Sequence, residues 1–324
     1  MAAWLLWSVM LAGAVWTMLS ELPAGAERRM PLPYLVALVP FVWIPMVLFA
    51  LVAAVLHEWG PMCCLLAVAL AASSRRLSYR SGGARRRTSK DAASDGSRER
   101  LRLMTLNCRY GRADAAAIVR EVRERGVDVL ALQEVSADLV ARLDRAGVAE
   151  ALPHRVVGES HETDNGGFNV LFTAQEPVRT ASDTVDIPAA DVPSATLGTE
   201  DGRTVTFVSA HPKSPMRGCE EWSRGVIGLG ALAADADETR VVCVMGDLNS
   251  SMEHPSFRSL IRAGFHDASF QQQAGPNPTF PRWTRWPRLE LDHILATRGA
   301  RFDEVEAFEV KDTDHLALTA RMTL

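Results

Sequence analysis

The chain has 324 residues, of which 48% are hydrophobic and 23% are charged, and its formal net charge is −4. This length permits one or two domains with a sizeable core. Five cysteines in such a chain exclude a scaffold built on disulfides. Residues 1–100 carry 11 Lys and Arg against 6 Asp and Glu, whereas residues 101–324 carry 24 against 33. The acidic second part excludes a protein that coats nucleic acid generally, and it suits a site that gathers a divalent metal ion.

The first 73 residues are predicted to form a membrane region. No charged residue occurs from Ala2 to Ser20, and a helix needs about 20 apolar residues to cross a bilayer. A second apolar stretch, residues 33–72, is interrupted by the polar break at residues 57–61 and is too long for one crossing. A cleaved signal peptide is the alternative for the first stretch, but such a peptide usually begins with a basic segment. We therefore expect three transmembrane helices, near residues 2–20, 33–55 and 58–73.

Residues 74–99 are predicted to be a basic, flexible linker beside the membrane. Residues 73–90 contain seven Arg or Lys side chains and no acid, a composition that attracts anionic lipid headgroups. A nucleic-acid-binding arm is the competing interpretation. Because cationic loops tend to stay in the cytoplasm, three crossings would place the C-terminal domain on the cytoplasmic side of a multi-pass cell-membrane protein. The expected partner of the N-terminal region is the membrane, and no obligate protein partner is evident.

Residues 100–324 are predicted to form one domain of mixed strands and helices. The spacing of Ile118, Val119 and Val122 predicts a helix over residues 114–125, and Gly126 is suited to end it. Short apolar runs predict strands at residues 101–106, 127–132, 204–210, 240–245, 291–295 and 316–322.

Carboxylate, amide or imidazole side chains stand at or near one end of these strands. If the strands lie side by side, their polar ends meet at one rim of the sheets. Hard oxygen ligands suit Mg²⁺ or Mn²⁺, and such an ion beside two histidines indicates hydrolysis of a phosphate ester. The candidate residues are Asn107, Glu134, His211, Asp247, Asn249, Asp292, Asp314 and His315.

Each candidate also has a structural interpretation when it is taken alone. Asn107 could cap a turn, and residues 246–249 (Gly-Asp-Leu-Asn) could form a turn whose side chains bond their own backbone. His211 could be a core histidine with satisfied hydrogen bonds. These alternatives become weak jointly, because all of them would have to occur by chance in one order and context.

The ordered set resembles the endonuclease/exonuclease/phosphatase superfamily over about residues 100–324. The resemblance implies a four-layer α/β (α+β) sandwich, in which two mixed β-sheets pack together and are flanked by helices. The matching segments are Met104-Thr-Leu-Asn107, Asp128-Val-Leu-Ala-Leu-Gln-Glu134, Ser209-Ala-His211, Gly246-Asp-Leu-Asn249, Leu291-Asp-His-Ile294 and Thr313-Asp-His315.

The resemblance also implies roles for the matched residues. Glu134 would be the principal ligand of Mg²⁺ or Mn²⁺, and Asn107 would help to hold that ion or its water. Asp247 would orient or deprotonate the attacking water, and Asn249 would hold a phosphate oxygen. His315 would stabilise the charge that grows on the phosphoryl group in the transition state.

Four further roles follow from the same resemblance. Asp292 and Asp314 would fix or balance the charge of that imidazole, and Asp314 is also assigned to a metal position. His211 resembles the histidine that protonates the leaving oxygen in the deoxyribonuclease branch. Asn169 lies where the family has a Gly/Asn motif and is expected to contact substrate, although residues 164–169 could instead form a turn.

These expectations define a membrane-anchored phosphodiesterase that depends on a divalent metal. Its substrate is a phosphate ester of a nucleic acid or of a phospholipid or small molecule. The tyrosine of the abasic-site endonuclease branch has no counterpart here, which disfavours that activity. Residues 282–288 interleave arginine and tryptophan, and this run could stack a base or sugar or face a lipid headgroup. The alternative from another class is a catalytically silent, membrane-bound binding module with the same fold.

Overall fold

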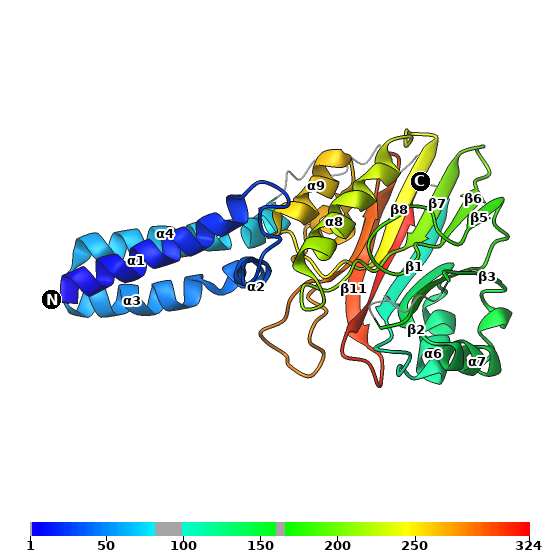
Figure 1. Cartoon of the computed structure of the whole chain (residues 1–324), viewed down its shortest axis with the longest axis horizontal. Helices are drawn as coiled ribbons and strands as arrows, with labels where there is room; N and C mark the ends of the chain where they lie inside the picture. The colour runs from blue at the N-terminus through cyan, green and yellow to red at the C-terminus, as the bar shows by residue number, and fades with distance from the viewer. Residues whose placement is uncertain (1, 82–98, 160–165) are drawn as a thin grey trace, which may run out of the picture.

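A bundle of helices projects from one side of a domain built on two β-sheets (Figure 1). The computed structural model describes residues 2–81, 99–159 and 166–324. We call residues 2–81 the helical arm and residues 99–324 the two-sheet domain. The N-terminus lies at the far end of the arm, and the C-terminus lies in the two-sheet domain.

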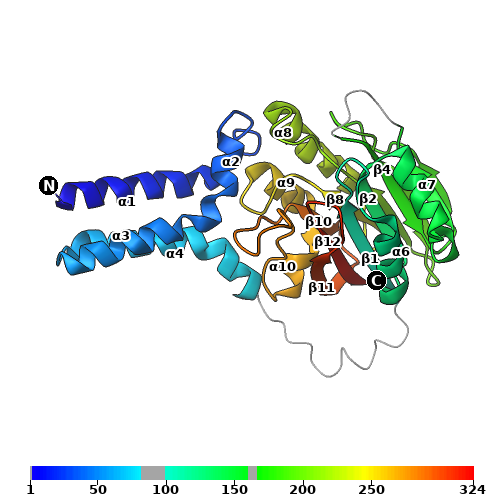
Figure 2. The same cartoon turned by 90° about the horizontal axis from the view of Figure 1, so that it is seen from below.

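Three helices lie side by side along the helical arm, as the second view also shows (Figure 2). They are joined by their own buried apolar cluster, to which Leu6, Met46 and Leu65 contribute one side chain from each helix. Met46 packs against Gly13, where a side chain would clash with it. The long helices are α1 (Ala2–Met18), α3 (Trp43–Val55) and α4 (Trp59–Ser81), and the short α2 (Leu32–Ala37) lies at the base of the arm.

The arm corrects the expectation of three transmembrane helices. Among the described residues, one helix, Ala3–Glu21, is long and apolar enough to cross a membrane, and Val39–Val55 is a shorter apolar helix. The predicted span at residues 33–55 is divided at Pro40, because proline has no N–H to continue a helix. The span expected at residues 58–73 belongs to α4, which continues through Arg75 and Arg76 to Ser81. The predicted linker is therefore helical over residues 74–81, and residues 82–98 lie outside the described part.

The two sheets of the domain each contain six strands and are mixed, as expected. In the first sheet β1 and β2 are parallel and the other pairs are antiparallel; in the second sheet the one parallel pair is β7 with β8. The first sheet has the order β11 (Arg301–Glu309), β12 (Leu316–Thr323), β1 (Arg100–Asn107), β2 (Val129–Val135), β4 (Phe168–Thr173), β3 (His154–Val157). The second has the order β5 (Arg179–Ala181), β6 (Ser194–Gly198), β7 (Thr204–Ser209), β8 (Arg240–Asp247), β10 (Asp292–Ala296), β9 (His266–Asp267).

The sheets pack face to face and are covered by helices on their outer faces. A central cluster joins them, with Leu103 and Ala320 from the first sheet against Phe207 and Met245 from the second. Separate apolar clusters join each sheet to its helices. This arrangement confirms the predicted sandwich of two mixed sheets flanked by helices. The covering helices are α6 (Ala115–Arg125) and α7 (Ala137–Arg145) on the first sheet, and α8 (Cys219–Gly228) and α9 (Pro255–Ala263) on the second.

Local signals explain where α6 begins and ends. The Asp114 carboxylate accepts hydrogen bonds from the N–H groups of Ala116 and Ala117, which caps the first turn. Gly126 ends the helix in the left-handed region with φ 61°. The helix predicted over residues 114–125 is therefore confirmed within one residue.

Buried polar contacts fix the arm to the two-sheet domain. The Glu27 carboxylate, which is fully buried, accepts a hydrogen bond of 2.6 Å from the backbone N–H of Ser256 at the start of α9. Arg75 of α4 forms an ion pair of 2.9 Å with the buried Glu253. Because a buried charge without a partner is costly, these contacts hold the arm in one position on the domain.

His254 makes the same junction sensitive to acid. Its Nε2–H donates to the carbonyl of Pro33 at 3.0 Å, and its Nδ1 accepts from the N–H of Ser251 at 2.9 Å, so the ring is neutral. Burial lowers the pKa of His254 to about 4, below the unfolded value of about 6.5. Its stabilising contribution is therefore complete above pH 6.5 and is lost as the pH falls toward 4. We expect the free energy of unfolding of the full chain to be about 2 kcal/mol lower at pH 5 than at pH 7 because of this residue.

Thermal unfolding of the full chain and of the His254→Gln variant, each at pH 7 and at pH 5, measures this difference. An equal pH dependence of the two proteins would contradict the role of His254.

Candidate active site

Strands from both sheets end at one rim of the sandwich and bring the predicted polar residues together there. Asn107 ends β1 in the first sheet, and Asp247 ends β8 in the second. The Asn107 amide bridges the two sheets, since its Nδ2 donates to Asp247 Oδ2 at 3.0 Å and to Glu134 Oε1 at 3.2 Å. Asp292 opens β10 directly opposite Asp247 in the antiparallel pairing of the second sheet. The rim expected from the strand ends is therefore present.

Glu134 is held at this rim by an unusual backbone conformation. Its φ is 52°, and the pairing of β2 with β4 shifts register there. Its Oε2 accepts a hydrogen bond of 2.9 Å from the N–H of Tyr110. Gly166 packs against the carboxylate and Gly167 against the backbone of Glu134 and Val135, where a Cβ would come within 3.0 Å. The two glycines therefore leave room for this carboxylate.

Residues 246–249 form a turn in which the Asp247 side chain bonds its own backbone, and this turn lies at the rim. Asp247 Oδ1 accepts a hydrogen bond of 2.9 Å from the N–H of Asn249, whose φ is 48°. A Cβ on Gly246 would lie 1.9 Å from the carbonyl oxygen of Ala210, so only glycine fits there. The Asn249 amide lies 3.3 Å from His211 Nε2 and donates to the Pro212 carbonyl at 3.2 Å. The turn interpretation is therefore confirmed, and the catalytic roles of Asp247 and Asn249 at this turn stay predictions.

His315 lies between two buried carboxylates. Its Nδ1 donates to Asp292 Oδ2 at 2.7 Å, and its Nε2 lies 3.6 Å from Asp247 Oδ2. Burial alone would lower its pKa, but the charges of Asp292 and Asp247 outweigh burial and raise the pKa of His315 to about 10. For Asp247, burial would raise the pKa, but the charge of His315 and the contact with His211 hold its pKa well below the usual range. The two carboxylates therefore favour the charged form of the His315 imidazole.

His211 lies on the other side of Asp247 and is fully buried. Its Nε2 is 3.6 Å from Asp247 Oδ2 and 3.9 Å from Glu134 Oε1. Burial would lower the pKa of His211, but the contact with Asp247 and the charges of Asp247 and Glu134 raise it above the ordinary value. His211 can therefore carry a proton at the same rim.

Asp314 and Asn169 make their polar contacts with other residues than those of this centre. The Asp314 carboxylate is 3.5 Å from Arg109 Nε, whereas Asp292 holds the His315 ring. Asn169 Nδ2 donates to the Asp191 carbonyl at 2.8 Å, and its Oδ1 is buried without a hydrogen-bond partner in the described part of the chain. The metal role of Asp314 and the substrate role of Asn169 therefore stay predictions. Asp164 and Asn165 of the same motif lie outside the described residues.

Two features of the rim were not predicted from the sequence. The Phe280 ring packs against the His315 ring, with centroids 4.8 Å apart. The Thr313 hydroxyl donates to the Asn107 carbonyl at 2.7 Å, which ties the segment before His315 to the end of β1. Thr313 lies within a matched motif, so its position could have suggested a role; Phe280 lies in an irregular segment with no such signal.

The donor set at the rim suits a hard cation. Glu134 Oε1 and Asp247 Oδ2 both accept from the Asn107 Nδ2, so two carboxylate oxygens lie beside this amide, whose own Oδ1 accepts from the N–H of Arg109 at 2.9 Å. Asp292 Oδ1 is buried and makes no hydrogen bond within the described residues. Asp247, Asp292 and His315 also form a compact group whose possible ligand atoms lie within 4.8 Å of one another. The rim therefore offers several carboxylate oxygens of the kind that a hard cation prefers.

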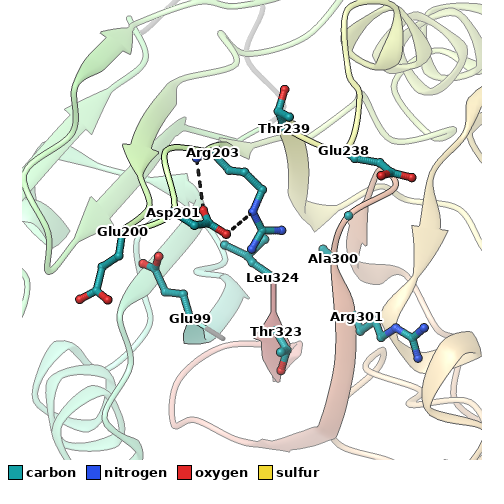
Figure 3. Close-up of a pocket in the computed structure, with 11 residues that line it drawn as sticks. Glu99, Glu200, Asp201, Arg203, Glu238, Thr239, Ala300, Arg301, Thr323 and Leu324 are labelled. Atoms are coloured by element: carbon teal, nitrogen blue, oxygen red, sulfur yellow. Dashed lines mark hydrogen bonds and ion pairs between the residues drawn. The ribbon is translucent and has the colours of Figure 1, made fainter. Parts of the chain in front are cut away.

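A large hollow lies at the opposite end of the strands and contains none of these residues. Its volume is about 910 Å³, and it is lined by Arg203 and Arg301 among several acidic groups. Figure 3 shows Asp201 paired with Arg203 at its edge. The hollow lies where β7, β8 and β11 begin, whereas β8 ends at Asp247. Size alone does not identify the site here.

The chain belongs to the endonuclease/exonuclease/phosphatase family, because the family profile matches residues 104–315. This range includes all the site residues described above. The family predicted from the ordered motifs is therefore confirmed. Among curated proteins, no relative matches the sequence.

Solved structures share the fold at low sequence identity. An endonuclease/exonuclease/phosphatase from Beutenbergia cavernae is 19% identical, with a TM-score of 0.57 over 70% of this chain and 72% of that one. D. rerio TDP2 complexed with a single-strand DNA product is 16% identical, with a TM-score of 0.57 over 69% of this chain and 99% of that one. Sphingomyelinase C from Streptomyces griseocarneus is 18% identical, with a TM-score of 0.50 over 69% and 99%. At this level of sequence identity, the similarity shows a common two-sheet fold.

Proposed function

We propose that the protein hydrolyses a phosphodiester with the help of a bound Mg²⁺ or Mn²⁺ ion. The observation that carries this proposal is the bridge between the sheets, in which Asn107 joins Glu134 to Asp247 beside the imidazoles of His211 and His315. Oxygen donors and imidazolium groups at one rim suit a substrate that carries negative charge on phosphorus. Membership of a family of phosphoesterases agrees with this chemistry.

Glu134 and Asn107 would hold the metal ion, with Asp247 beside them. When bound, a divalent cation there would neutralise charge on the phosphoryl oxygens and favour ionisation of a nearby water. The other roles in the reaction belong to side chains of this protein.

Four side chains at the rim would move protons or stabilise charge during the hydrolysis. Asp247, kept ionised by its neighbours, orients the attacking water and accepts its proton as the new bond to phosphorus forms. Asn249 donates to a phosphoryl oxygen, and the His315 imidazolium, held by Asp292, stabilises the charge that develops there. His211 gives its proton to the ester oxygen as the bond between phosphorus and that oxygen breaks.

We also propose that the helical arm anchors the protein in a membrane through α1, which lies in the one helix of the described residues that is long and apolar enough to span it. α1 has 17 residues, which at 1.5 Å per residue make about 26 Å, close to the thickness of a hydrocarbon core. Exposed tryptophans lie at or near the first residues of the three long helices, Trp4 in α1, Trp43 in α3 and Trp59 in α4, and tryptophan is enriched at membrane interfaces. Arg75 and Arg76 at the base favour the cytoplasmic side for the two-sheet domain.

Two substrate classes fit a phosphodiesterase of this fold. TDP2 is complexed with single-strand DNA, and sphingomyelinase C belongs to the same group of folds. Activity of the full chain in detergent on bis(p-nitrophenyl) phosphate tests the shared chemistry. Turnover that requires Mg²⁺ or Mn²⁺ and stops with a chelator supports the proposal; folded protein without any turnover contradicts it.

Glu134→Gln is expected to weaken metal use rather than to unfold the protein. The substitution removes the charge of the proposed principal ligand, while the amide can still accept from the Tyr110 N–H. The concentration of Mn²⁺ for half-maximal turnover should rise at least tenfold, roughly the loss known for altered metal-site partners. Isothermal titration of Mn²⁺ and an activity titration measure it. An unchanged metal requirement would exclude Glu134 as the ligand.

A further inference from the structure

A loop of the two-sheet domain connects the active-site rim with the base of the helical arm. We call residues 280–289 the tryptophan loop. It is closed by a β-bridge between Phe280 and Leu289. At its inner end Phe280 packs on His315, and the N–H of Arg282 donates to the Asp314 carbonyl at 2.7 Å. The inner end of the loop is therefore part of the wall of the site.

The outer end of the same loop touches the helical arm. The rings of Trp286 and Phe41 are in edge contact with centroids 5.8 Å apart, and the Arg76 guanidinium of α4 lies over the Phe41 ring, 5.0 Å from its centroid. Directly after the loop, the buried Glu290 accepts a hydrogen bond of 2.5 Å from the Tyr79 hydroxyl of α4. The loop is thus fixed at the place where the arm meets the domain.

The side chains that the loop exposes are aromatic and cationic. Trp283 is 67% exposed and Trp286 is 58% exposed, and Arg285 between them is also exposed. Arg282 and Arg288 instead donate to backbone carbonyls at the foot of the loop. Tryptophan beside arginine suits the headgroup layer of an anionic membrane, where the ring is partly buried and the cation meets phosphate.

We infer that the tryptophan loop lies on the lipid surface and that the substrate is a phosphodiester carried by a membrane lipid. This inference rests on the proposed function and names the substrate class of the same site. The loop stands beside the apolar arm and reaches His315 at its other end, so a lipid headgroup at the arm's base lies at the entrance to the site. A single-stranded nucleic acid could stack on the same rings, but the net negative charge of residues 101–324 disfavours it.

The test uses the full chain reconstituted in vesicles of phosphatidylcholine and phosphatidylglycerol. Headgroup release from the vesicle lipids and turnover of bis(p-nitrophenyl) phosphate are measured for the parent, for Trp283→Ala/Trp286→Ala, and for Trp59→Ala as a matched control at the far end of the arm. We expect the double variant to lose about tenfold in lipid turnover, the order expected when apolar anchors leave an interface. Its turnover of the soluble diester should fall by much less than its lipid turnover, and that smaller loss measures the edge contact of Trp283 with Phe280, whose centroids are 5.9 Å apart.

A second measurement does not depend on which lipid is the substrate. In vesicles that contain brominated phosphatidylcholine, the fluorescence of Trp283 and Trp286 should be quenched. The Trp283→Phe/Trp286→Phe variant should therefore show a smaller loss of fluorescence on binding these vesicles.

Arg285→Glu should lower the rate of lipid turnover on anionic vesicles and leave the rate on neutral vesicles unchanged.

The outcomes separate this inference from the proposed function. No turnover of the soluble diester by the folded parent overturns the proposed function itself. Soluble turnover with no hydrolysis of vesicle lipid, and with unquenched loop tryptophans, overturns only the lipid inference. Loop-dependent cleavage of single-stranded DNA without lipid cleavage overturns it too, in favour of a nucleic-acid substrate.

Discussion

Asp247→Asn is expected to lower kcat for bis(p-nitrophenyl) phosphate by about 10³- to 10⁴-fold, near the upper range for loss of a general base. The carboxylate is the common neighbour of Asn107, His211 and His315. An amide in its place keeps the shape but has no negative charge to orient the water or to accept its proton. Both histidines would also lose the negative charge of Asp247, which raises their pKa.

The measurement is steady-state kinetics of the full chain with saturating Mn²⁺, beside thermal unfolding. The matched control is Asp237→Asn, a carboxylate on an exposed turn that bonds Thr239 and Arg240; its kcat should stay close to that of the parent. A residual kcat in Asp247→Asn within tenfold of the parent, in folded protein, would remove Asp247 from the catalytic centre.

His315→Gln is expected to lower kcat by about 10²- to 10³-fold, the usual cost of removing one transition-state donor. The pKa of His315 is raised to about 10, so its charged form should persist through neutral pH and be lost as the pH rises past 10. Activity of the parent should therefore fall on the alkaline side near that value, and His315→Gln should lack that fall.

Asp292→Asn tests whether the pH dependence of the rate follows the pKa of His315 while the imidazole itself is kept. It removes the charge that holds His315 Nδ1 at 2.7 Å, so the pKa of His315 should move down toward its ordinary value near 6.5. The alkaline fall in the pH–rate profile should shift to lower pH in this variant. A profile identical to that of the parent would show that His315 does not act as the charged group.

Regular, buried strands with polar ends were predictable from the sequence. β1 and β8 are apolar runs that end at a site residue, and β12 begins directly after His315, so the presence of these strands and their polar ends followed from period and termination. β6 (Ser194–Gly198) is buried but made of small residues, and β11 (Arg301–Glu309) is a half-exposed edge strand rich in charge. Neither has the apolar periodicity that marks a strand, so both were missed.

The same limit applies to the site and to the arm. Which of Asp292 and Asp314 holds the His315 ring depends on side-chain direction, which spacing does not give. The Phe280 contact with His315 comes from an irregular loop placed by tertiary packing. In the arm, composition predicted apolar helices, but their lengths were set by Pro40 and by the continuation of α4 past Ser73 to Tyr79, which docks on Glu290.

The polar junction between arm and domain has a consequence for how the enzyme meets its substrate. Glu27, Arg75 and Tyr79 hold the domain at one height and one angle relative to the arm. With the arm in a bilayer, as proposed, the site would stay at a fixed distance from the membrane surface while the molecule diffuses laterally. Encounter would then be a search in two dimensions, and the rate would follow the number of substrate molecules per unit of membrane area rather than their concentration in bulk water.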